Sequence, residues 1–474
     1  MDECECISMD EYLSMERSAP TAGEEKGPWR IPADEYAILS FGREKTGLLS
    51  LRVTAEKDCE VFLAFDELLP DGRIDAIRNG TCNLVKYTLA AGTYELTTAE
   101  PYSLAFLEVS ARGGGILLSA VEIIRVGFPE IAKKLRSDDP EEQKIFDAAV
   151  QTFRQNTFDV YMDCPSRERA GWLCDSFFTS RVEFALTGRS DVERVFLGNF
   201  LDAESFPHLP EGMLPMCYPA NHTDGNFIPN WAMWYVLELR EYFGRSGDRA
   251  LVDRAKPRVL GLVRYFDAFL NADGLLEKLQ AWVFVEWSKA NRLVQDVNFP
   301  TNALYAAMLD AVAELYGLPE YSDKAEKIRR FIRENARAGK FFCDNAVREN
   351  GALRLSGECT EVCQYYMFYF GVASPESDPE LWRILRDEFG PDRQKNGLYP
   401  EIYPANAFIG NYLRLDYLAR RGLMDQVLRE MRGYFLYMSE TTGTLWEHVS
   451  PEASCNHGFA SHAAVWLLQA RGER

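Results

Sequence analysis

Apolar and polar positions alternate along the first part of the chain, with a period of two residues. Leu49, Leu51 and Val53 are separated by polar residues, and the same alternation returns in several later runs. Turn-forming residues separate the runs, among them three consecutive glycines at 113–115. Short alternating strands divided by turns at this spacing predict an antiparallel β-sandwich over residues 28–128.

The pattern changes to a helical period from about residue 135. Asp139, followed by Pro140 and two glutamates, is typical of a helix start, with a capping carboxylate and acids in the first turn. Apolar residues at helical spacing predict twelve helices from here on. The predicted helices cover residues 139–158, 175–187, 190–204, 229–244, 247–271, 299–316, 322–338, 358–372, 378–389, 405–421, 424–437 and 458–472.

The connections between the predicted helices are of two kinds. Some are tight turns that contain glycine, and others are long loops rich in proline, glycine and aromatic residues. The long loops lie at 205–228, 273–298, 391–404 and 438–457. This pattern predicts helical hairpins arranged in a ring, an (α/α)6 barrel over residues 135–474 with the long loops at one mouth. Long loops in a compact domain usually carry function.

Cysteine content and apolar runs indicate where the protein is located and whether it binds a metal or a membrane. Eleven scattered cysteines, an odd number, show neither a disulfide framework nor a zinc pattern, so we expect free thiols, no metal and a cytoplasmic location. Residues 1–27 are polar and are interpreted as an N-terminal segment or linker. They lack the features of a secretory signal. No apolar run reaches the roughly 18 residues that a membrane span needs, so we expect no membrane partner.

The formal net charge of −20, from 72 acidic and 52 basic residues, would repel a phosphate backbone. We therefore expect no nucleic-acid partner. A neutral sugar would not be repelled.

Candidate chemistry is concentrated in residues 163–175, with the sequence DCPSRERAGWLCD. This stretch combines three carboxylates, two arginines and a tryptophan, and its proline and glycine make a continuous helix unfavourable. A second acidic site, Glu447, follows Trp446 in the last long loop. Acids on separate loops of one barrel mouth suit glycoside hydrolysis, which needs one protonated and one ionised carboxyl group. Taken alone, each acid could equally be an ordinary surface residue.

The first segment closely resembles the signature of the α-L-rhamnosidases, family 78 of the glycoside hydrolases. The resemblance extends to the TTGTLWEH segment at 441–448 and the SCNHG segment at 454–458. It implies an inverting hydrolase that removes terminal α-L-rhamnose without a cofactor, with Glu168 as the general acid and Glu447 as the general base. Further residues implied to bind the sugar are Asp163, Arg167, Trp172, Asp175, Trp446 and His457.

Two more tryptophans are candidates for the sugar site. Trp231 and Trp234 lie three apart on one helical face and could be core residues or a sugar platform, and Trp231 is nearer the loop mouth. Glu286 and Trp287 resemble a family segment at the sugar site, although Trp287 could equally belong to a short buried strand. Arg167 could bind sugar or position Glu168.

Other functions stay open at this point. A hydrolase of another deoxy sugar or a pentose would share the carboxylate pair, and a catalytically silent barrel could bind carbohydrate. Retention of both glutamates favours an enzyme. The expected partner is a rhamnosylated small molecule or oligosaccharide, and the sequence does not distinguish a monomer from a homo-oligomer.

Overall fold

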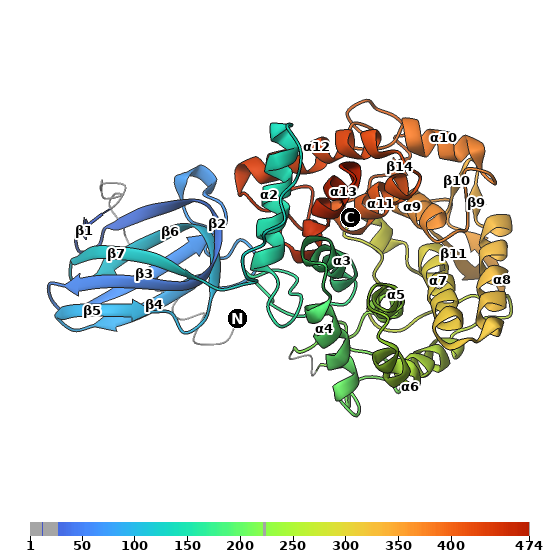
Figure 1. Ribbon diagram of the computed structural model, residues 1–474, viewed down its shortest axis with the longest axis horizontal. Coiled ribbons are helices and arrows are strands. Elements are labelled where there is room, and N and C mark those ends of the chain that lie inside the picture. The colour runs from blue at the N-terminus through green and yellow to red at the C-terminus, as the bar shows by residue number, and fades with distance from the viewer. Residues whose placement is uncertain (1–11, 13–26, 221–223, 474) are drawn as a thin grey trace.

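The computed structural model describes Tyr12, residues 27–220 and residues 224–473. A β part and a helical part lie side by side along the long axis of the molecule (Figure 1). The predicted N-terminal segment, residues 1–27, lies outside the described residues except at Tyr12 and Gly27.

The β part is one antiparallel sheet that folds over into two layers, as the alternating pattern predicts. Its strands are β1 (Trp29–Ile31), β2 (Tyr36–Ala55), β3 (Cys59–Asp66), β4 (Leu84–Leu89), β5 (Gly92–Thr97), β6 (Tyr102–Arg112) and β7 (Ile116–Arg125). The strand order is β1-β7-β2-β6-β3-β4, and β5 pairs with β2. The short 3₁₀ turn η1 (Pro70–Gly72) follows β3.

The long strand β2 belongs to both layers. Its first half pairs with β6 and its second half pairs with β5 and β7. Leu49, Leu51 and Val53 are at most 2% exposed and face the apolar core between the layers, as predicted. The register shifts between Ser40 and Lys45, and such a bulge turns the intervening side chains to new directions.

Twelve α-helices follow within the described residues, as the periodicity predicts. They are α2 (Pro140–Gln155), α3 (Asp175–Thr187), α4 (Asp191–Asp202), α5 (Pro229–Ser246), α6 (Arg249–Asp267), α7 (Phe299–Tyr316), α8 (Pro319–Asn335), α9 (Glu361–Tyr369), α10 (Pro379–Asp387), α11 (Tyr412–Arg420), α12 (Met424–Thr441) and α13 (Ala463–Ala470). Asp139 caps the first of them by accepting the backbone N–H groups of Glu141 and Glu142. None of the described helices is both long and apolar enough to cross a membrane.

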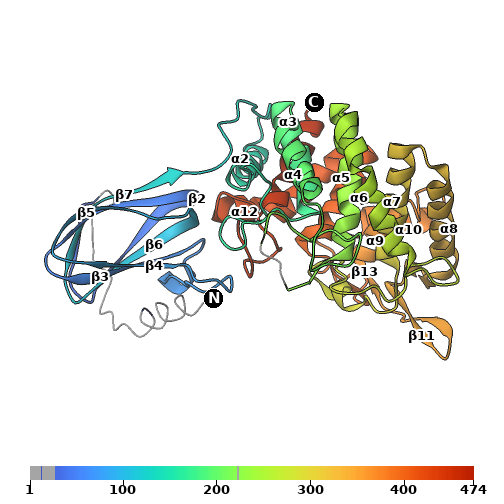
Figure 2. The ribbon, with the colours of Figure 1, turned by 90° about the horizontal axis from the view of Figure 1, so that it is seen from below.

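Inner and outer helices alternate around the barrel. The inner helix α7 buries nearly every side chain, whereas the neighbouring outer helix α8 buries only Ala325, Ile328 and Ile332. Three inner helices, α3, α5 and α7, end at a left-handed glycine that starts a tight turn to the next outer helix. The connections from outer to inner helices are long, and Figure 2 shows β11 and β13 from one of them at one end of the barrel.

The long connections contain small elements that the periodicity did not predict. They are η2 (Lys289–Arg292), β8 (Val297–Asn298), β9 (Arg337–Ala338), β10 (Phe341–Phe342), β11 (Asn345–Glu349), β12 (Ala352–Leu355), β13 (Cys359–Thr360), β14 (Ile402–Tyr403), η3 (Ala407–Asn411) and η4 (Gly458–His462). Two predicted helices, 405–421 and 458–472, therefore begin later as regular α-helix than expected. Their first residues form η3 and η4 instead.

Candidate active site

The loop between α2 and α3 carries the acidic motif and is closed by its own backbone. Asp163 Oδ1 accepts a hydrogen bond from the Ala170 backbone N–H at 3.0 Å, and the Asp163 N–H donates to the Ala170 carbonyl at 3.0 Å. Glycine is required at 171, because a Cβ there would lie 2.5 Å from the Tyr218 carbonyl oxygen. The motif residues are therefore held in one conformation before α3 begins.

The loop between α12 and α13 lies against this first loop. Within it, the Glu447 N–H donates to the Ser454 carbonyl at 3.0 Å and the His457 N–H donates to the Leu445 carbonyl at 2.9 Å. The Gly458 N–H then donates to the Asp163 carbonyl at 2.6 Å. These bonds bring the two acidic segments together, although almost 300 residues separate them in the chain.

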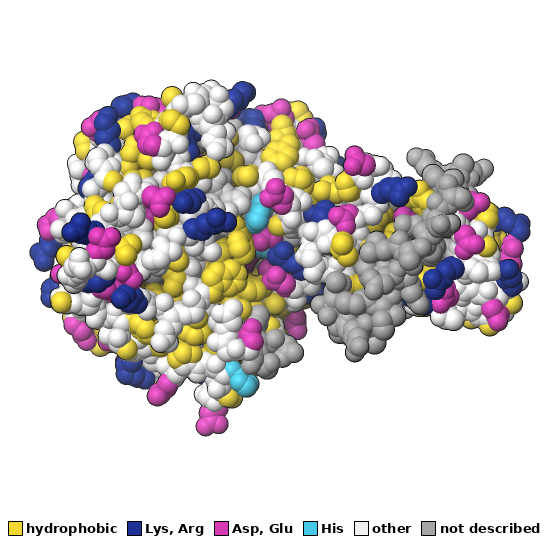
Figure 3. All heavy atoms as spheres, turned by 180° about the vertical axis from the view of Figure 1, so that it is seen from behind, with side chains coloured by type: hydrophobic (Ala, Val, Ile, Leu, Met, Phe, Trp, Pro, Cys, Tyr) yellow, Lys and Arg dark blue, Asp and Glu magenta, His cyan; other side chains and the backbone are white. Residues whose placement is uncertain are grey.

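Both loops line one cavity of about 230 Å³. Its lining residues are Asp163, Arg167, Glu168, Trp172, Asp175, Ile228, Trp231, Trp282, Phe284, Trp287, Phe408, Glu447 and His457. On the face seen in Figure 3, histidine, acidic and basic side chains lie next to a broad band of hydrophobic side chains. A cavity with acids and aromatic rings can hold a ligand that has both hydroxyl groups and an apolar face.

Arg167 lies between the two glutamates. Its Nε is 3.0 Å from Glu168 Oε1, and its Nη2 donates to Glu447 Oε2 at 3.2 Å. The Glu168 side chain is 39% exposed, whereas that of Glu447 is 5% exposed. One carboxyl group thus faces the cavity entrance and the other lies deeper inside.

Positive neighbours keep Glu447 ionised. Burial alone would raise the pKa of Glu447, but the charges of His457 and Arg167 outweigh it and lower that pKa. Burial alone would likewise lower the pKa of His457, but the charge of Glu447 and the hydrogen bond to Asp175 raise it to about 9. At neutral pH Glu447 is therefore a carboxylate and His457 an imidazolium.

Two buried aspartates complete the polar side of the cavity. Asp163 is 2% exposed and Asp175, the first residue of α3, is 4% exposed. Burial, reinforced by the charge of Glu168, raises the pKa of Asp163 to about 7. Burial also raises the pKa of Asp175, which pairs with His457 at 3.1 Å. Buried carboxyl groups of this kind are stabilised when a ligand hydroxyl donates to them.

Aromatic rings from the start of α5 and from two other connections form the apolar side. Trp231, at the start of α5, is 3% exposed and contacts Phe284 edge-on at 4.8 Å between ring centroids. Trp287 is 40% exposed and lies 5.6 Å from Trp282. Phe408, which the sequence analysis did not single out, stacks on Phe459 at 3.8 Å and lines the cavity. A proline-rich loop next to a predicted helix was the signal that could have identified it.

Two motif tryptophans differ in position. Trp172 lines the cavity. Trp446 is not among the described residues that line it. It is 3% exposed, donates its Nε1–H to Thr442 Oγ1 at 2.9 Å and packs edge-on against Tyr437 at 5.3 Å.

Two further ionisable groups adjoin the cavity: His448, which the sequence did not point to, and Glu286, which precedes Trp287 in the segment that resembles a family sugar-site segment. His448 Nε2 lies 3.7 Å from Glu447 Oε1, and burial lowers the pKa of His448, so its imidazole is neutral. Glu286 is fully buried and accepts the Gly410 N–H at 2.8 Å, which connects the loop of Trp287 to η3. Burial raises the pKa of Glu286 to about 8.

One group of described residues has the spacing of metal ligands. Asp163, Cys164 and His457 each offer a ligand atom, and these atoms lie within 4.8 Å of one another. The Cys164 thiol donates to Asp163 at 2.8 Å, and burial raises the pKa of this thiol well above its ordinary value. A metal would require the thiolate and a neutral imidazole, so the protonation states of the site do not favour it.

The helical part matches a known protein family along nearly its whole length. Residues 131–470 match the family model described as the bacterial alpha-L-rhamnosidase 6 hairpin glycosidase domain. An α-L-rhamnosidase of Alteromonas sp. (strain LOR) is 23% identical over 325 residues, which cover 65% of this chain and 35% of that protein. The chain thus spans about a third of the length of that curated relative.

Solved structures share the fold of both parts. The family 78 rhamnosidase of Bacillus sp. GL1 has a TM-score of 0.81 at 18% identity, covering 93% of this chain and 47% of that one. A rhamnosidase from Klebsiella oxytoca has a TM-score of 0.77 at 18% identity, covering 94% and 89%. This likeness confirms the predicted fold class, a β-sandwich followed by an (α/α)6 barrel. Since the family model covers well over half of the chain, the chain belongs to the family of bacterial α-L-rhamnosidase six-hairpin glycosidase domains.

Proposed function

We propose that this protein is an inverting glycoside hydrolase that removes terminal α-L-rhamnose from small glycosides or oligosaccharides. Glu168 acts as the general acid and Glu447 as the general base. The proposed reaction uses water alone as co-substrate and needs no metal or cofactor.

The chemistry follows from the two carboxyl groups. Glu447 removes a proton from a water molecule, whose oxygen attacks the anomeric carbon from the face opposite the leaving group. As the glycosidic bond breaks, Glu168 gives its proton to the departing oxygen. The products are the free sugar with inverted configuration and the aglycone alcohol, and a proton then returns from Glu447 to Glu168 through solvent.

The observation that carries this proposal is the arrangement of Glu168, Arg167 and Glu447 at one cavity. A base must be ionised, and the charges of His457 and Arg167 lower the pKa of Glu447. An acid must reach the bond to the leaving group, and Glu168 is the more exposed of the two glutamates. The two roles thus have a physical basis in their surroundings.

The lining of the cavity supports a 6-deoxy sugar. Asp163 and Asp175 can accept hydrogen bonds from sugar hydroxyls, whereas Trp231, Phe284 and Phe408 offer apolar surface to a methyl group. A volume of about 230 Å³ is below the range of drug-sized pockets and suits a single sugar ring. The Klebsiella oxytoca rhamnosidase was solved with rhamnose bound, which supports the same substrate class.

A panel of nitrophenyl glycosides tests the proposal. We expect hydrolysis of the α-L-rhamnoside well above that of the other deoxy-hexosides and pentosides, and release of the β-anomer of rhamnose in the first NMR spectra. Preference for another sugar would reassign the substrate. Retention of configuration would contradict the mechanism, and saturable sugar binding without turnover would indicate a carbohydrate-binding protein.

A further inference from the structure

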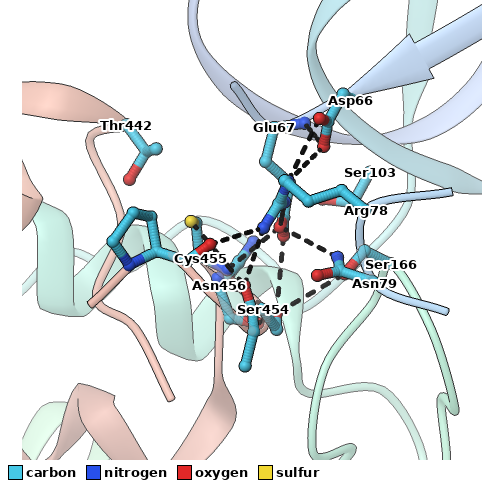
Figure 4. A network of polar contacts seen from close by, with 12 residues as sticks. Asp66, Glu67, Arg78, Asn79, Ser103, Ser166, Thr442, Ser454, Cys455 and Asn456 are labelled. Atoms are coloured by element: carbon cyan, nitrogen blue, oxygen red, sulfur yellow. Dashed lines mark hydrogen bonds and ion pairs between the residues drawn. The ribbon is translucent and has the colours of Figure 1, made fainter. Parts of the chain in front are cut away.

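The loop that carries Glu447 is held by the β part of the molecule as well as by the barrel. This loop, residues 442–456, leaves α12 and returns to the barrel at η4. Side chains from β2, from the end of β3 and from the turn before β4 contact it at two places, one on each side of Glu447. Figure 4 shows the contacts on the C-terminal side.

Arg78 makes contacts both within the β part and to the loop. Its Nε donates to Asp66 Oδ1 at 2.9 Å and its Nη2 donates to Glu67 Oε2, both within the β part. Its Nη1 reaches across to the barrel and donates to the carbonyl oxygens of Pro451 at 3.0 Å and Ala453 at 2.8 Å. One guanidinium thus joins two buried carboxylates of the sheet to the backbone of the loop.

Glu67 contacts the next two residues of the loop, Ser454 and Cys455. Its Oε2 accepts the backbone N–H of Cys455 at 3.0 Å, and its Oε1 lies 3.4 Å from Ser454 Oγ. The Ser454 carbonyl in turn accepts the backbone N–H of Glu447 at 3.0 Å. Only one backbone hydrogen bond therefore separates the residues held by the β part from the general base.

A second contact holds the N-terminal side of the loop. Glu44 lies in the irregular stretch of β2, and its backbone N–H donates to the Thr442 carbonyl at 2.9 Å. The Thr444 hydroxyl is 3.0 Å from Glu44 Oε2 and 2.7 Å from the Cys455 carbonyl oxygen. Both ends of the segment that carries Glu447 are thus tied to the β part.

These contacts exclude water. The side chains of Asp66 and Glu67 are at most 1% exposed and that of Arg78 is 10% exposed. Charged hydrogen bonds in such surroundings are strong and directional, and loss of one partner leaves a buried group unsatisfied. The arrangement is therefore stiffer than ordinary surface ion pairs, which contribute little to stability.

We propose that Arg78 is a positioning residue for the general base. Through Glu67, Pro451 and Ala453 it fixes the 442–456 loop and so the place of the Glu447 carboxylate in the cavity. The β part is thereby a component of the catalytic apparatus, although none of its described residues lines the cavity. This inference rests on the role proposed above for Glu447.

The test is Arg78→Lys, which keeps the positive charge beside Asp66 and Glu67 but cannot donate to them and to both carbonyl groups at once. We expect kcat to fall by roughly 10- to 100-fold, because a displacement of about 1 Å can cost a hundredfold in rate. KM should stay within about twofold, since the sugar contacts are intact. The control is Arg52→Lys in the same sheet, where Arg52 pairs with Glu95 on the surface, and its kcat should be unchanged.

Two further measurements separate positioning from a merely structural role. The loss in Arg78→Lys should be equal for aryl and alkyl rhamnosides, because a displaced base affects every leaving group alike. In a Glu447→Gln background, Arg78→Lys should cause little further loss, because the two changes act on one function. A full additional loss in that background would overturn the proposal.

Folding is followed by circular dichroism and melting temperature, with Glu67→Gln as a second variant of unchanged size. If either variant is folded and retains a kcat within about twofold of the wild type, the inference is wrong. Absence of rhamnosidase activity in the wild-type protein would instead contradict the proposed function, so the two failures are distinguishable.

Discussion

The imidazole of His457 lies between Glu447 and Asp175, with Nδ1 3.5 Å from Glu447 Oε2 and Nε2 3.1 Å from Asp175 Oδ1. The charge of Glu447 and the hydrogen bond to Asp175 raise the pKa of His457 to about 9, and the charges of His457 and Arg167 in turn lower the pKa of Glu447. The histidine therefore acts as a fixed positive charge beside the proposed base, not as a proton donor that titrates near neutrality.

Replacing His457 should change the pH dependence of catalysis. In His457→Gln the proposed base loses the charge that lowers its pKa most, so the pKa of Glu447 rises and the acidic limb of the kcat/KM profile moves to higher pH. The loss of kcat/KM relative to the wild type should thus be larger at pH 5 than at pH 7. A matched His208→Gln variant on the exposed surface should leave the profile unchanged, and an unmoved acidic limb in His457→Gln would contradict the assignment of Glu447 as base.

The same histidine makes a testable contribution to stability. Its pKa is raised from 6.5 to about 9 in the folded state, so its stabilising effect is complete below about pH 6.5 and is lost as pH rises through about 9. The melting temperature of the wild type should therefore fall between pH 7 and pH 10 by more than that of His457→Gln. Parallel curves for the two proteins would show that the imidazolium has no part in stability.

The two glutamates should differ in their response to the leaving group. Glu168→Gln removes the proton donor, so hydrolysis of alkyl rhamnosides should fall by roughly 10²- to 10⁴-fold while a nitrophenyl rhamnoside suffers less. Glu447→Gln removes activation of water, so both substrates should lose activity by the same factor. Kinetics on the two substrate types check this, and equal losses on both substrates in both variants would contradict the roles.

Much of the helical barrel could be predicted from local signals. Asp139 marks the start of α2 and Gly188 the end of α3, and the apolar period between such signals gives the helix itself. The predicted helices 405–421 and 458–472 begin too early. Residues 405–411 and 458–462 are not regular α-helix, because contacts with distant loops determine their conformation. The Gly410 N–H, for example, donates a hydrogen bond to the carboxyl group of Glu286, which is more than a hundred residues away in the chain.

The candidate site, like the barrel, could be predicted only in part. Glu168 and Glu447 could be identified because a motif fixes them in order along the chain. The aromatic wall of the cavity could be identified only in part, because the side of a buried helix that faces a cavity depends on tertiary packing. Trp231 and Trp234 lie on one helical face, yet Trp231 lines the cavity whereas Trp234 is fully buried against Phe177.

Asp163 should make the protein sensitive to pH below neutrality. Burial raises its pKa from 3.8 to about 7, so its protonated form is favoured by the fold. Its stabilising effect is complete below about pH 3.8 and is lost as pH rises through about 7. Asp163→Asn cannot ionise, and its melting temperature should fall less than that of the wild type between pH 4 and pH 8. The exposed Asp253→Asn is the control, and should follow the wild-type curve.

The two tryptophans Trp287 and Trp446 should have different roles, although the resemblance places both at the sugar. Trp287 is 40% exposed at the cavity, so Trp287→Ala should raise KM for the rhamnoside by about three- to tenfold through loss of an aromatic contact, with little change in melting temperature. Trp446 is buried away from the cavity and donates to Thr442, so Trp446→Phe should leave KM unchanged and lower the melting temperature by about 1–3 °C. Rhamnoside kinetics and thermal melts of both variants decide the matter. A raised KM in a fully stable Trp446→Phe would return Trp446 to the sugar site, and an unchanged KM in Trp287→Ala would remove Trp287 from it.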